Sequence, residues 1–334
     1  MTGNENRTGC NPQDIGALMQ RFNRRRALKG LGWSAVALSS WAPWCGCSKP
    51  AVTAPARAQI TTTVSMVTDL VKRVAGDRCL IQGLMGPGVD PHLYKATAGD
   101  VIALQKADIT FYVGLHLEGK MQDNFEKMSQ SGRKVRAITS AIPKERLLKP
   151  AEFEGNFDPH VWFDVELWSL CLKPVAEALS ELAPEAAAYF QQNANAALKS
   201  FETLHSWAKA KAAELPENRR ILVTSHDAYN YFGRAYGFQV VALQGISTVT
   251  EASLADLTRL VDFIKARRIP SIFVESSVPR NTIDRISHDA GVRVGGELFS
   301  DAMGTPGQME NGYDLGTYDG MIRHNLTTIV EGLK

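Results

Sequence analysis

The stretch PEAAAYFQQNANAALKSFETLHSWAKAKAAEL, residues 184–215, decides the fold of this 334-residue chain. Pro184 suits the first turn of a helix, alanines are frequent, and no proline or glycine follows until Pro216. The pattern predicts one continuous helix of about 30 residues, roughly 45–48 Å long at about 1.5 Å per residue. Because such a helix is longer than an ordinary domain is wide, we expect it to run as a strut along two lobes.

Short strands and helices alternate on both sides of the long helix. Before it, the pattern predicts strands at 59–65 and 107–114 and helices at 66–77 and 97–107. After it, the pattern predicts strands at 219–226, 238–245, 270–277 and 292–300 and helices at 227–237, 250–269, 279–291 and 316–334. Strands that alternate with helices form βαβ units around a parallel sheet.

We therefore predict an α/β protein in which two lobes of parallel sheet, flanked by helices, are bridged by one long rigid helix. The predicted boundaries are an N-terminal lobe at 59–183, the helix at 184–215 and a C-terminal lobe at 216–334. Each lobe has the size of an ordinary domain. Residues 1–58 are set apart from both lobes as a leader.

The charges of the chain are distributed unevenly. Residues 1–58 hold 8 of the 37 Lys and Arg and 2 of the 35 Asp and Glu, so residues 59–334 hold 29 against 33, a net charge of −4. Nucleic-acid binding needs clustered cations that displace phosphate counterions, and the mildly acidic body has no basic run of this kind. We therefore expect no nucleic-acid partner.

The leader has the pattern of an export signal. An arginine pair at 24–25 precedes an apolar run at 30–44, which is shorter than the about 20 residues of a membrane span. The pair resembles a twin-arginine signal, although Ala27 stands where an aromatic residue is usual. Cleavage after Ala58 would give a periplasmic protein, whereas a lipid on Cys47 would anchor it to the outer face of the membrane. The alternative, an apolar helix of a cytosolic protein, gives no reason for the flanking arginines.

If the leader is removed, Cys79 and Cys171 are the cysteines that remain. They lie far apart in the sequence and lack a CxxC partner, so they predict neither a zinc cluster nor a thioredoxin-like site. One disulfide in an oxidising compartment and two packed free thiols are both consistent with the sequence.

Two Asp-Pro-His tripeptides in predicted loops indicate a site in the N-terminal lobe. They are Asp90-Pro91-His92 and Asp158-Pro159-His160. A lone histidine is weak evidence for a ligand, but the repeated tripeptide makes coincidence less attractive. Each proline fixes its own φ and restricts the aspartate before it, which presets the loop geometry.

Two further metal-binding side chains follow predicted strands of the C-terminal lobe. His226 comes directly after ILVTS and Asp301 directly after GELFS. Ligands of open α/β sheets sit beyond the carboxyl ends of strands, so a cleft between the lobes would gather all four side chains. Three imidazoles and one carboxylate can enclose a divalent transition metal. We predict that His92, His160, His226 and Asp301 bind one such ion. Taken singly, His226 could cap the next helix and Asp301 could be a turn residue.

Carboxylates close to these histidines in sequence or at strand ends could orient the ring N–H groups, with helix capping as the alternative. They are Asp90, Asp158, Asp227 and Glu275. The other histidines are weaker candidates. His205 is expected to be solvated on the long helix, and His288 and His324 are expected to be packing or surface groups. His116 is a spare histidine that could reach the cleft.

Six motifs carry a resemblance to a known family. They are GVDPHLY (88–94), DPHVWFD (158–164), TSHDAYNYFGRAYGF (224–238), FVESSVP (273–279), GELFSDAMG (296–304) and GTYDGMIRHN (316–325). In this order, from about residue 60 to the end, the chain resembles the metal-specific solute-binding proteins of ABC transporters, in the TroA-like zinc/manganese branch. The resemblance implies a C-clamp of two α/β lobes bridged by one helix, with the metal between them.

The resemblance also implies a function. It assigns metal ligation to His92, His160, His226 and Asp301, the four residues that the strand ends and tripeptides had indicated. It implies extracytoplasmic capture of Zn²⁺ or Mn²⁺ as a transported ligand, and delivery to an ABC permease in the membrane. We expect a monomer that is not an enzyme.

The chain departs from the family pattern in three places. Manganese-selective relatives usually carry a glutamate where this chain has His226, and because imidazole suits zinc better than manganese, zinc is favoured. Zinc-uptake relatives often add a His-rich loop, yet residues 118–159 contain no histidine. The segment 305–315, TPGQMENGYDL, is longer than the usual connection, and the sequence gives no account of it.

Two other functions compete with metal capture. A zinc hydrolase needs an open coordination position and a general base, but the chain has no HExxH and four protein ligands would close the coordination sphere. A surface adhesin would need a receptor surface, which nothing in the sequence indicates. For capture we expect the metal affinity to fall as the histidines protonate, because protons compete for the same lone pairs.

Overall fold

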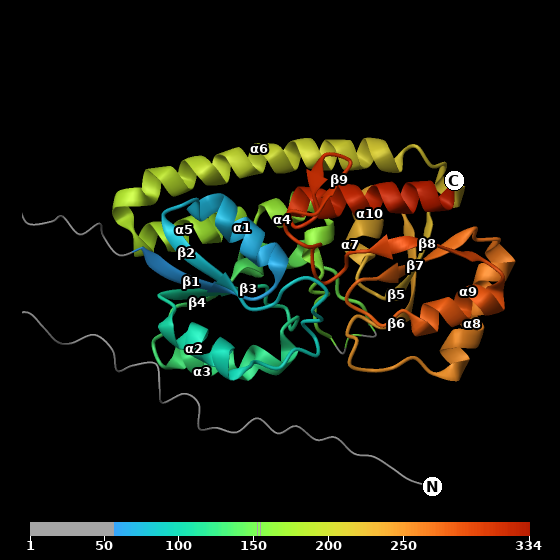
Figure 1. The fold of residues 1–334 in the computed structure, drawn as a ribbon, viewed down its shortest axis with the longest axis horizontal. Coiled ribbons are helices and arrows are strands. Elements are labelled where there is room, and N and C mark those ends of the chain that lie inside the picture. Colours follow the sequence, from blue (N-terminus) through green and yellow to red (C-terminus); the bar gives the residue numbers. More distant parts are fainter. Residues whose placement is uncertain (1–56, 152, 154) are drawn as a thin grey trace, which may run out of the picture. The chain divides into compact units, whose positions relative to one another are not determined.

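The strands of the N-terminal half form one parallel sheet. This computed structural model describes residues 57–151, 153 and 155–334, so the predicted leader lies outside the described residues except for Arg57 and Ala58. The sheet consists of β1 (Ala58–Thr62), β2 (Cys79–Gly83), β3 (Ile109–Tyr112) and β4 (Val135–Ala137), in the order β2-β1-β3-β4. Its carboxyl ends face the C-terminal half of the molecule (Figure 1).

Three helices flank this sheet, namely α1 (Ser65–Ala75), α2 (Ala98–Lys106) and α3 (Gln122–Gln130). Helix α1 buries an apolar stripe at i, i+3 and i+4 spacing, which includes Val67, Leu70 and Val74. Helix α2 begins with a capping box, in which the Thr97 hydroxyl and the Asp100 carboxylate each accept the other's backbone N–H. The sequence therefore specifies where these helices start and which faces they bury.

The C-terminal half repeats the strand–helix alternation. Its strands are β5 (Ile221–His226), β6 (Gln239–Gln244), β7 (Ser271–Glu275) and β8 (Arg293–Leu298), which pair in parallel as β5-β6 and β7-β8, with β5 beside β7. Its helices are α7 (Asn230–Tyr236), α8 (Leu254–Arg267), α9 (Asn281–Ala290) and α10 (Tyr318–Leu333). All five residues of β7 are buried, as expected for a parallel strand covered on both faces.

The predicted long helix is present. A 3₁₀ turn at Pro184–Ala186 leads into α6 (Ala187–Ala212), a helix of 26 residues. It packs against α1, α4 (Val165–Ser169) and α5 (Leu172–Leu182) of the N-terminal half and against α7 and α10 of the C-terminal half (Figure 1). The strut therefore joins both halves, and the predicted fold class is confirmed. Pro55–Lys334 form one compact unit, so the lobe boundaries 59–183 and 216–334 stay a prediction.

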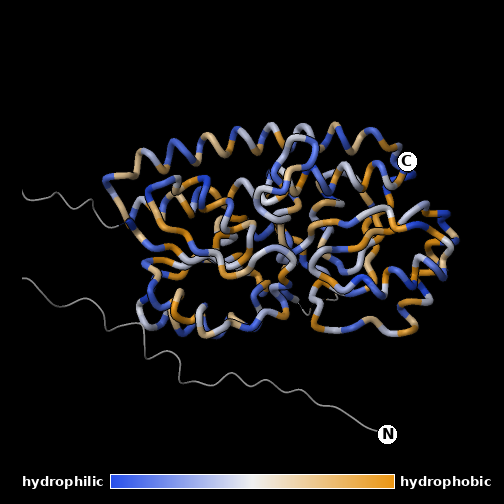
Figure 2. Tube along the Cα trace, viewed as in Figure 1, coloured by the Kyte–Doolittle hydropathy of each residue, from blue (hydrophilic) through white to orange (hydrophobic). Residues whose placement is uncertain are grey.

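The remaining short helices are 3₁₀ turns. They are η1 (Gly119–Met121), η2 (Ile138–Ala141), η3 (Lys144–Arg146), η4 (Val161–Phe163), η5 (Pro184–Ala186) and η6 (Glu217–Arg219). Figure 2 shows apolar residues concentrated on the strands and on the inward faces of the helices, with polar residues outside.

Cys79 and Cys171 are both buried free thiols, so of the two alternatives, packed thiols and a disulfide, the structure has packed thiols. Among the described residues, no helix has the length and hydrophobicity that a membrane span needs.

The unexplained segment 305–315 forms a hairpin of β9 (Met309–Glu310) and β10 (Tyr313–Asp314) against α10. The guanidinium of Arg323 lies 4.5 Å from the ring centre of Trp207 on α6 and 4.4 Å from that of Tyr313 on the hairpin. His324 Nδ1 lies 2.8 Å from Glu310 Oε1. The hairpin therefore connects the strut to the closing helix.

Candidate metal centre

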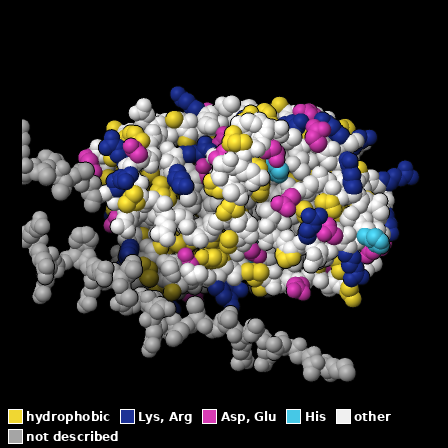
Figure 3. Space-filling model, viewed as in Figure 1, with side chains coloured by type: hydrophobic (Ala, Val, Ile, Leu, Met, Phe, Trp, Pro, Cys, Tyr) yellow, Lys and Arg dark blue, Asp and Glu magenta, His cyan; other side chains and the backbone are white. Residues whose placement is uncertain are grey.

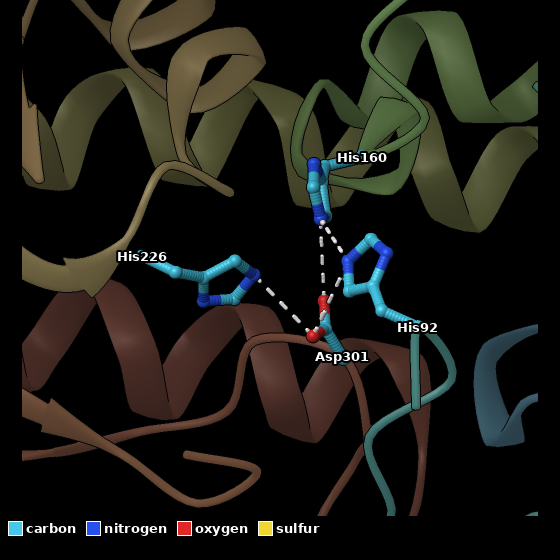
Figure 4. Close-up of side chains that lie close together, drawn as sticks. All are labelled: His92, His160, His226 and Asp301. Atoms are coloured by element: carbon cyan, nitrogen blue, oxygen red, sulfur yellow. Dashed lines mark hydrogen bonds and ion pairs between the residues drawn. The ribbon is translucent and has the colours of Figure 1, made fainter. Parts of the chain in front are cut away.

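The elements of both halves place the predicted ligands at the carboxyl ends of parallel strands. His226 is the last residue of β5, and Asp301 lies in the loop that follows β8. In the N-terminal half, His92 lies in the loop between β2 and α2, and His160 directly precedes the 3₁₀ turn η4. Figure 4 shows the four side chains pointing toward one another from these separate segments.

The structure brings these four side chains together. One donor atom from each of them lies within 4.8 Å of every other. The Nε2 of His160 lies 3.4 Å from Nε2 of His92 and 3.4 Å from Oδ1 of Asp301. The Oδ2 of Asp301 lies 3.3 Å from Nε2 of His226 and 3.8 Å from Nε2 of His92. Four donors about 2.0–2.1 Å from a central zinc ion in a tetrahedron would be roughly 3.3–3.4 Å apart, which these distances approach.

The cluster is sealed from solvent, and three of its polar atoms that face the centre have no hydrogen-bond partner among the described residues. His160, His226 and Asp301 have no exposed surface, and His92 is 3% exposed. Among the described residues, His226 Nε2 and both carboxylate oxygens of Asp301 are buried without a hydrogen-bond partner. Buried polar atoms are nearly always satisfied, so such atoms facing one small volume fit a bound cation.

Carboxylates lie behind two of the histidine rings. Oδ1 of Asp158 lies 2.8 Å from His160 Nδ1 and accepts the backbone N–H of His160 at 2.9 Å. Oε2 of Glu275 lies 2.5 Å from His226 Nδ1, and its Oε1 accepts the backbone N–H groups of Ser225 and His226. An Nδ1–H that faces a carboxylate leaves the Nε2 lone pair directed at the centre, as a metal ligand requires.

The other two predicted carboxylates are placed differently. Asp90 accepts the backbone N–H of His92 at 2.8 Å, so it contacts the main chain of this histidine. Its second oxygen accepts a hydrogen bond from the Thr248 hydroxyl at 2.6 Å. The backbone N–H of Asp227 donates to the carbonyl oxygen of Gly245 at 3.2 Å, and the predicted role of its carboxylate stays a prediction.

The charges in the cluster shift the pKa values of its members strongly. Burial would raise the pKa of Asp301, but His226 and His160 hold it well below its usual value. Burial would lower the pKa of His160, but Asp158 and Asp301 raise it to about 9, and Glu275 and Asp301 hold the pKa of His226 well above its usual value. Burial lowers the pKa of His92 to about 3. The neighbouring carboxylates therefore favour the charged form of His160 and His226, whereas burial favours the neutral form of His92.

The other histidines lie outside the cluster. His116 is exposed, with a positive φ of 66°, and the side chain of His288 is 90% exposed. The prediction that His205 is solvated is wrong, because its side chain is only 13% exposed and its ring lies 5.7 Å from that of Tyr236 on α7. His324 contacts Glu310 of the hairpin and is a packing group, as predicted.

The sequence interpretation missed two residues that hold the Asp-Pro-His loops from the other half. Thr248 donates to Asp90, and the side-chain amide of Asn230 donates to Oδ2 of Asp158 at 3.2 Å. Asn230 lies within one of the quoted motifs, which is the only signal that could have drawn attention to it. Thr248 lies in a connecting segment with no recognisable pattern.

Comparisons with known proteins agree with this geometry. The family described as zinc-uptake complex component A, periplasmic, matches residues 60–332. The zinc-binding protein TroA of Treponema pallidum is 48% identical over 279 residues, which cover 82% of this chain and 88% of that protein. The manganese-binding lipoprotein MntA of Bacillus subtilis is 41% identical over 295 residues, which cover 87% of this chain and 94% of that protein.

The fold is shared with a solved relative. The structure of the periplasmic zinc-binding protein TroA from Treponema pallidum superposes with a TM-score of 0.78 at 46% identity, and the match covers 83% of this chain and 99% of that one. We conclude that this chain belongs to the family of zinc- and manganese-specific solute-binding proteins of ABC transporters.

Proposed function

We propose that this protein captures a divalent transition metal ion outside the cytoplasm and delivers it to an ABC-type permease in the membrane. The observation that carries the proposal is the convergence of His92, His160, His226 and Asp301 on one buried volume, with donor atoms within 4.8 Å of one another. The metal is the cargo of the protein, and the four side chains are its ligands. Metal-binding names among the relatives, such as those of TroA and MntA, support this reading.

The electrostatics of the centre suit reversible capture. Asp301 supplies one negative charge, and the three histidines bind as neutral imidazoles through their Nε2 atoms. The carboxylates of Asp158 and Glu275 orient two of these rings and increase their basicity as ligands. A metal ion that enters the centre replaces the protons that otherwise balance the carboxylates, so binding and proton release are coupled.

Zinc is the favoured cargo and manganese is the alternative. Three nitrogen donors and one carboxylate suit zinc, whereas manganese prefers more oxygen ligands. Both oxygens of Asp301 face the histidines, Oδ1 toward His160 and Oδ2 toward His226, so this carboxylate can offer one oxygen or two. The relatives include proteins named for each metal. Elemental analysis of the protein after incubation with equal, limiting zinc and manganese would identify the preferred ion.

The location and partners follow from the family and the leader. The solute-binding proteins of ABC transporters work with permeases, and relatives named as periplasmic or as lipoproteins support an extracytoplasmic location. We further propose export by a twin-arginine-like signal within residues 1–58, either with cleavage after Ala58 or with a lipid on Cys47, and a monomeric state. Lys/Arg and Asp/Glu side chains are interspersed on the face that Figure 3 shows, and we propose no nucleic-acid partner.

An enzymatic role is not favoured. The relatives are solute-binding proteins, and four protein donors around one tetrahedral ion would leave no coordination position for a catalytic water. Nothing among the described residues favours an adhesin as the primary role. We therefore propose a binding protein without catalysis.

A metal titration of three proteins would test the proposal. The wild type should bind zinc tightly. The affinity of His226→Ala for zinc should fall by at least about 10- to 100-fold, because this variant lacks a ligand. The control variant His288→Ala should bind zinc as the wild type does. His288 is a matched control because it is an exposed histidine of the same half. Equal zinc affinity of His226→Ala and the wild type would remove His226 from the centre and contradict the proposal.

A further inference from the structure

The buried position of the centre requires that a ligand moves before metal can leave. His160, His226 and Asp301 have no exposed surface, and a carboxylate lies behind the ring of each of the two histidines. His92 differs from them. It is the most exposed of the four ligands, and in the described part of the chain no carboxylate hydrogen-bonds the outer nitrogen of its ring. Among the three histidine rings of the described centre, that of His92 therefore has the weakest hydrogen-bonded support.

The two Asp-Pro-His loops share one construction. In each loop, the first carboxylate oxygen of the aspartate accepts the backbone N–H of its own histidine, at 2.8 Å for Asp90 and 2.9 Å for Asp158. In each loop, the second oxygen accepts a side-chain hydrogen bond from the C-terminal half, from Thr248 at 2.6 Å and from Asn230 at 3.2 Å. Each aspartate therefore connects the main chain of a ligand to the opposite half.

The two connections differ in the surroundings of the residue that makes them. Asn230 is the first residue of α7, and the next residue, Tyr231, donates its hydroxyl to the carbonyl oxygen of Asp158 at 2.9 Å. The backbone N–H of Asp158 also donates to Leu148, so several bonds hold this loop. Thr248 instead lies in the segment between β6 and α8, residues 245–253, which contains no helix or strand.

Thr248 is turned inward on that segment. Thr248 is 8% exposed, whereas the next residue, Val249, is 60% exposed. On the opposite side, the loop that carries Asp90 also brings His92 beside the C-terminal half, with Nε2 3.8 Å from Oδ2 of Asp301. An added Cβ on Gly88 would lie 3.4 Å from the carbonyl oxygen of Ser276, so the two backbones approach closely there without a side-chain bond. Among the described residues, the Thr248–Asp90 bond is therefore the one side-chain hydrogen bond between this loop and the C-terminal half.

We infer that Thr248 is a positioning residue that holds His92 in the centre and sets the rate at which the metal leaves. While the hydroxyl of Thr248 binds Asp90, the backbone of His92 is fixed and its Nε2 stays within reach of the ion. When this bond breaks, the loop with Asp90 and His92 is the part of the centre that is free to move first. The inference rests on the proposed function, because it concerns release of the same metal.

Three variants would test this inference. Thr248→Val keeps the shape of the side chain and removes the hydroxyl, Thr248→Ser keeps the hydroxyl, and Thr250→Val removes an exposed hydroxyl of the same segment that has no hydrogen bond in the described structure. Each variant is loaded with zinc and mixed with an excess of a chromogenic chelator in a stopped-flow instrument. The rate constant of metal release is measured, together with the midpoint of thermal unfolding.

The expected result is a selective change in the release rate. Thr248→Val should release zinc about tenfold faster, the factor expected when a hydrogen bond to a charged group is lost, while Thr248→Ser and Thr250→Val stay near the wild-type rate. The same ordering should appear with manganese in place of zinc. Amide hydrogen exchange of residues 86–92 should be faster in Thr248→Val, because the loop has lost its connection.

Two results would overturn the inference. A release rate in Thr248→Val equal to that of the wild type would show that the bond does not control release. An equal acceleration by Thr250→Val would assign the effect to the segment as a whole and not to the bond. In both cases wild-type zinc binding would be intact, so the proposed function would stand; failure of the wild type to bind zinc or manganese would overturn both.

Discussion

The Nδ1 atom of His226 lies 2.5 Å from Oε2 of Glu275, at the ends of the neighbouring strands β5 and β7. The other oxygen of Glu275 accepts the backbone N–H groups of Ser225 and His226 at 2.7 and 2.9 Å. One buried carboxylate therefore fixes both the ring and the main chain of a proposed ligand. This arrangement makes the tautomer of His226 depend on Glu275.

Replacement of Glu275 by glutamine should weaken metal binding without removing a ligand. The amide carries no charge, and its NH2 group would face N–H groups that the carboxylate now accepts. We therefore expect zinc affinity to fall by about 10- to 100-fold. Competition with a chelator of known affinity measures this change. Glu217→Gln, at an exposed glutamate of the same half, serves as the control and should bind as the wild type does. Unchanged affinity in Glu275→Gln would mean that the carboxylate has no effect on the ligand.

Zinc binding should release protons at neutral pH. Asp158 and Asp301 raise the pKa of His160 to about 9, and Glu275 and Asp301 hold that of His226 well above its usual value, so both rings carry protons before the metal binds. The ion needs both rings neutral, so zinc affinity should fall as pH decreases from about 9. Calorimetric titrations in buffers of different ionisation enthalpy measure the protons released. A binding heat that does not depend on the buffer would contradict this prediction.

His205 should contribute to the loss of stability in mild acid. Burial and Lys209 lower its pKa, and Asp164 and Glu166 oppose this shift, so the folded state favours the neutral ring. The unfolded chain binds a proton near pH 6.5, so stability is fully present above that value and falls as pH decreases below it. His205→Gln should therefore lose less stability than the wild type between about pH 7 and pH 5.5. Urea unfolding at both values measures the difference.

The same unfolding curves can also contradict this prediction. The metal-centre histidines are identical in the two proteins, so their titration cancels when the changes with pH are compared. An equal loss of stability in His205→Gln and the wild type would show that the pKa of His205 is the same in the folded and unfolded states.

Phe201 should be one of the main stabilising residues of the strut. It is buried on α6, its ring lies 5.0 Å from that of Tyr318 on α10, and the guanidinium of Arg73 on α1 lies 5.3 Å from its centre. Phe201→Ala should reduce the free energy of unfolding by about 3–5 kcal/mol through lost burial and a cavity. Glu202→Ala, at the exposed neighbour, should change it by less than about 0.5 kcal/mol. Similar values for both variants would contradict a role of Phe201 in joining the halves.

Much of the fold and of the candidate site could be predicted because local patterns determine them. The capping boxes at Thr97 and Ser253 mark where α2 and α8 begin, and the unbroken run after Pro184 predicts the strut. His226 could be placed because ligands of parallel sheets gather at the carboxyl ends of strands. These features depend on neighbours in sequence or on a general rule of topology.

The features that could not be predicted depend on contacts between distant segments. The sequence shows neither that Thr248 would lie 2.6 Å from Asp90 nor that Tyr236 of α7 would cover His205 on the strut. The hairpin at 305–315 has strands of two residues each, which are too short to give a periodic pattern. Tertiary packing decides each of these cases.

The two thiols in the described part of the chain have a consequence for biogenesis. Cys79 and Cys171 are buried and not joined to each other, so this part of the molecule needs no oxidant to reach its native state. Folding can be completed equally well in a reducing cytosol and in an oxidising envelope. Redox conditions therefore place no constraint on whether this part of the polypeptide acquires its structure before or after export.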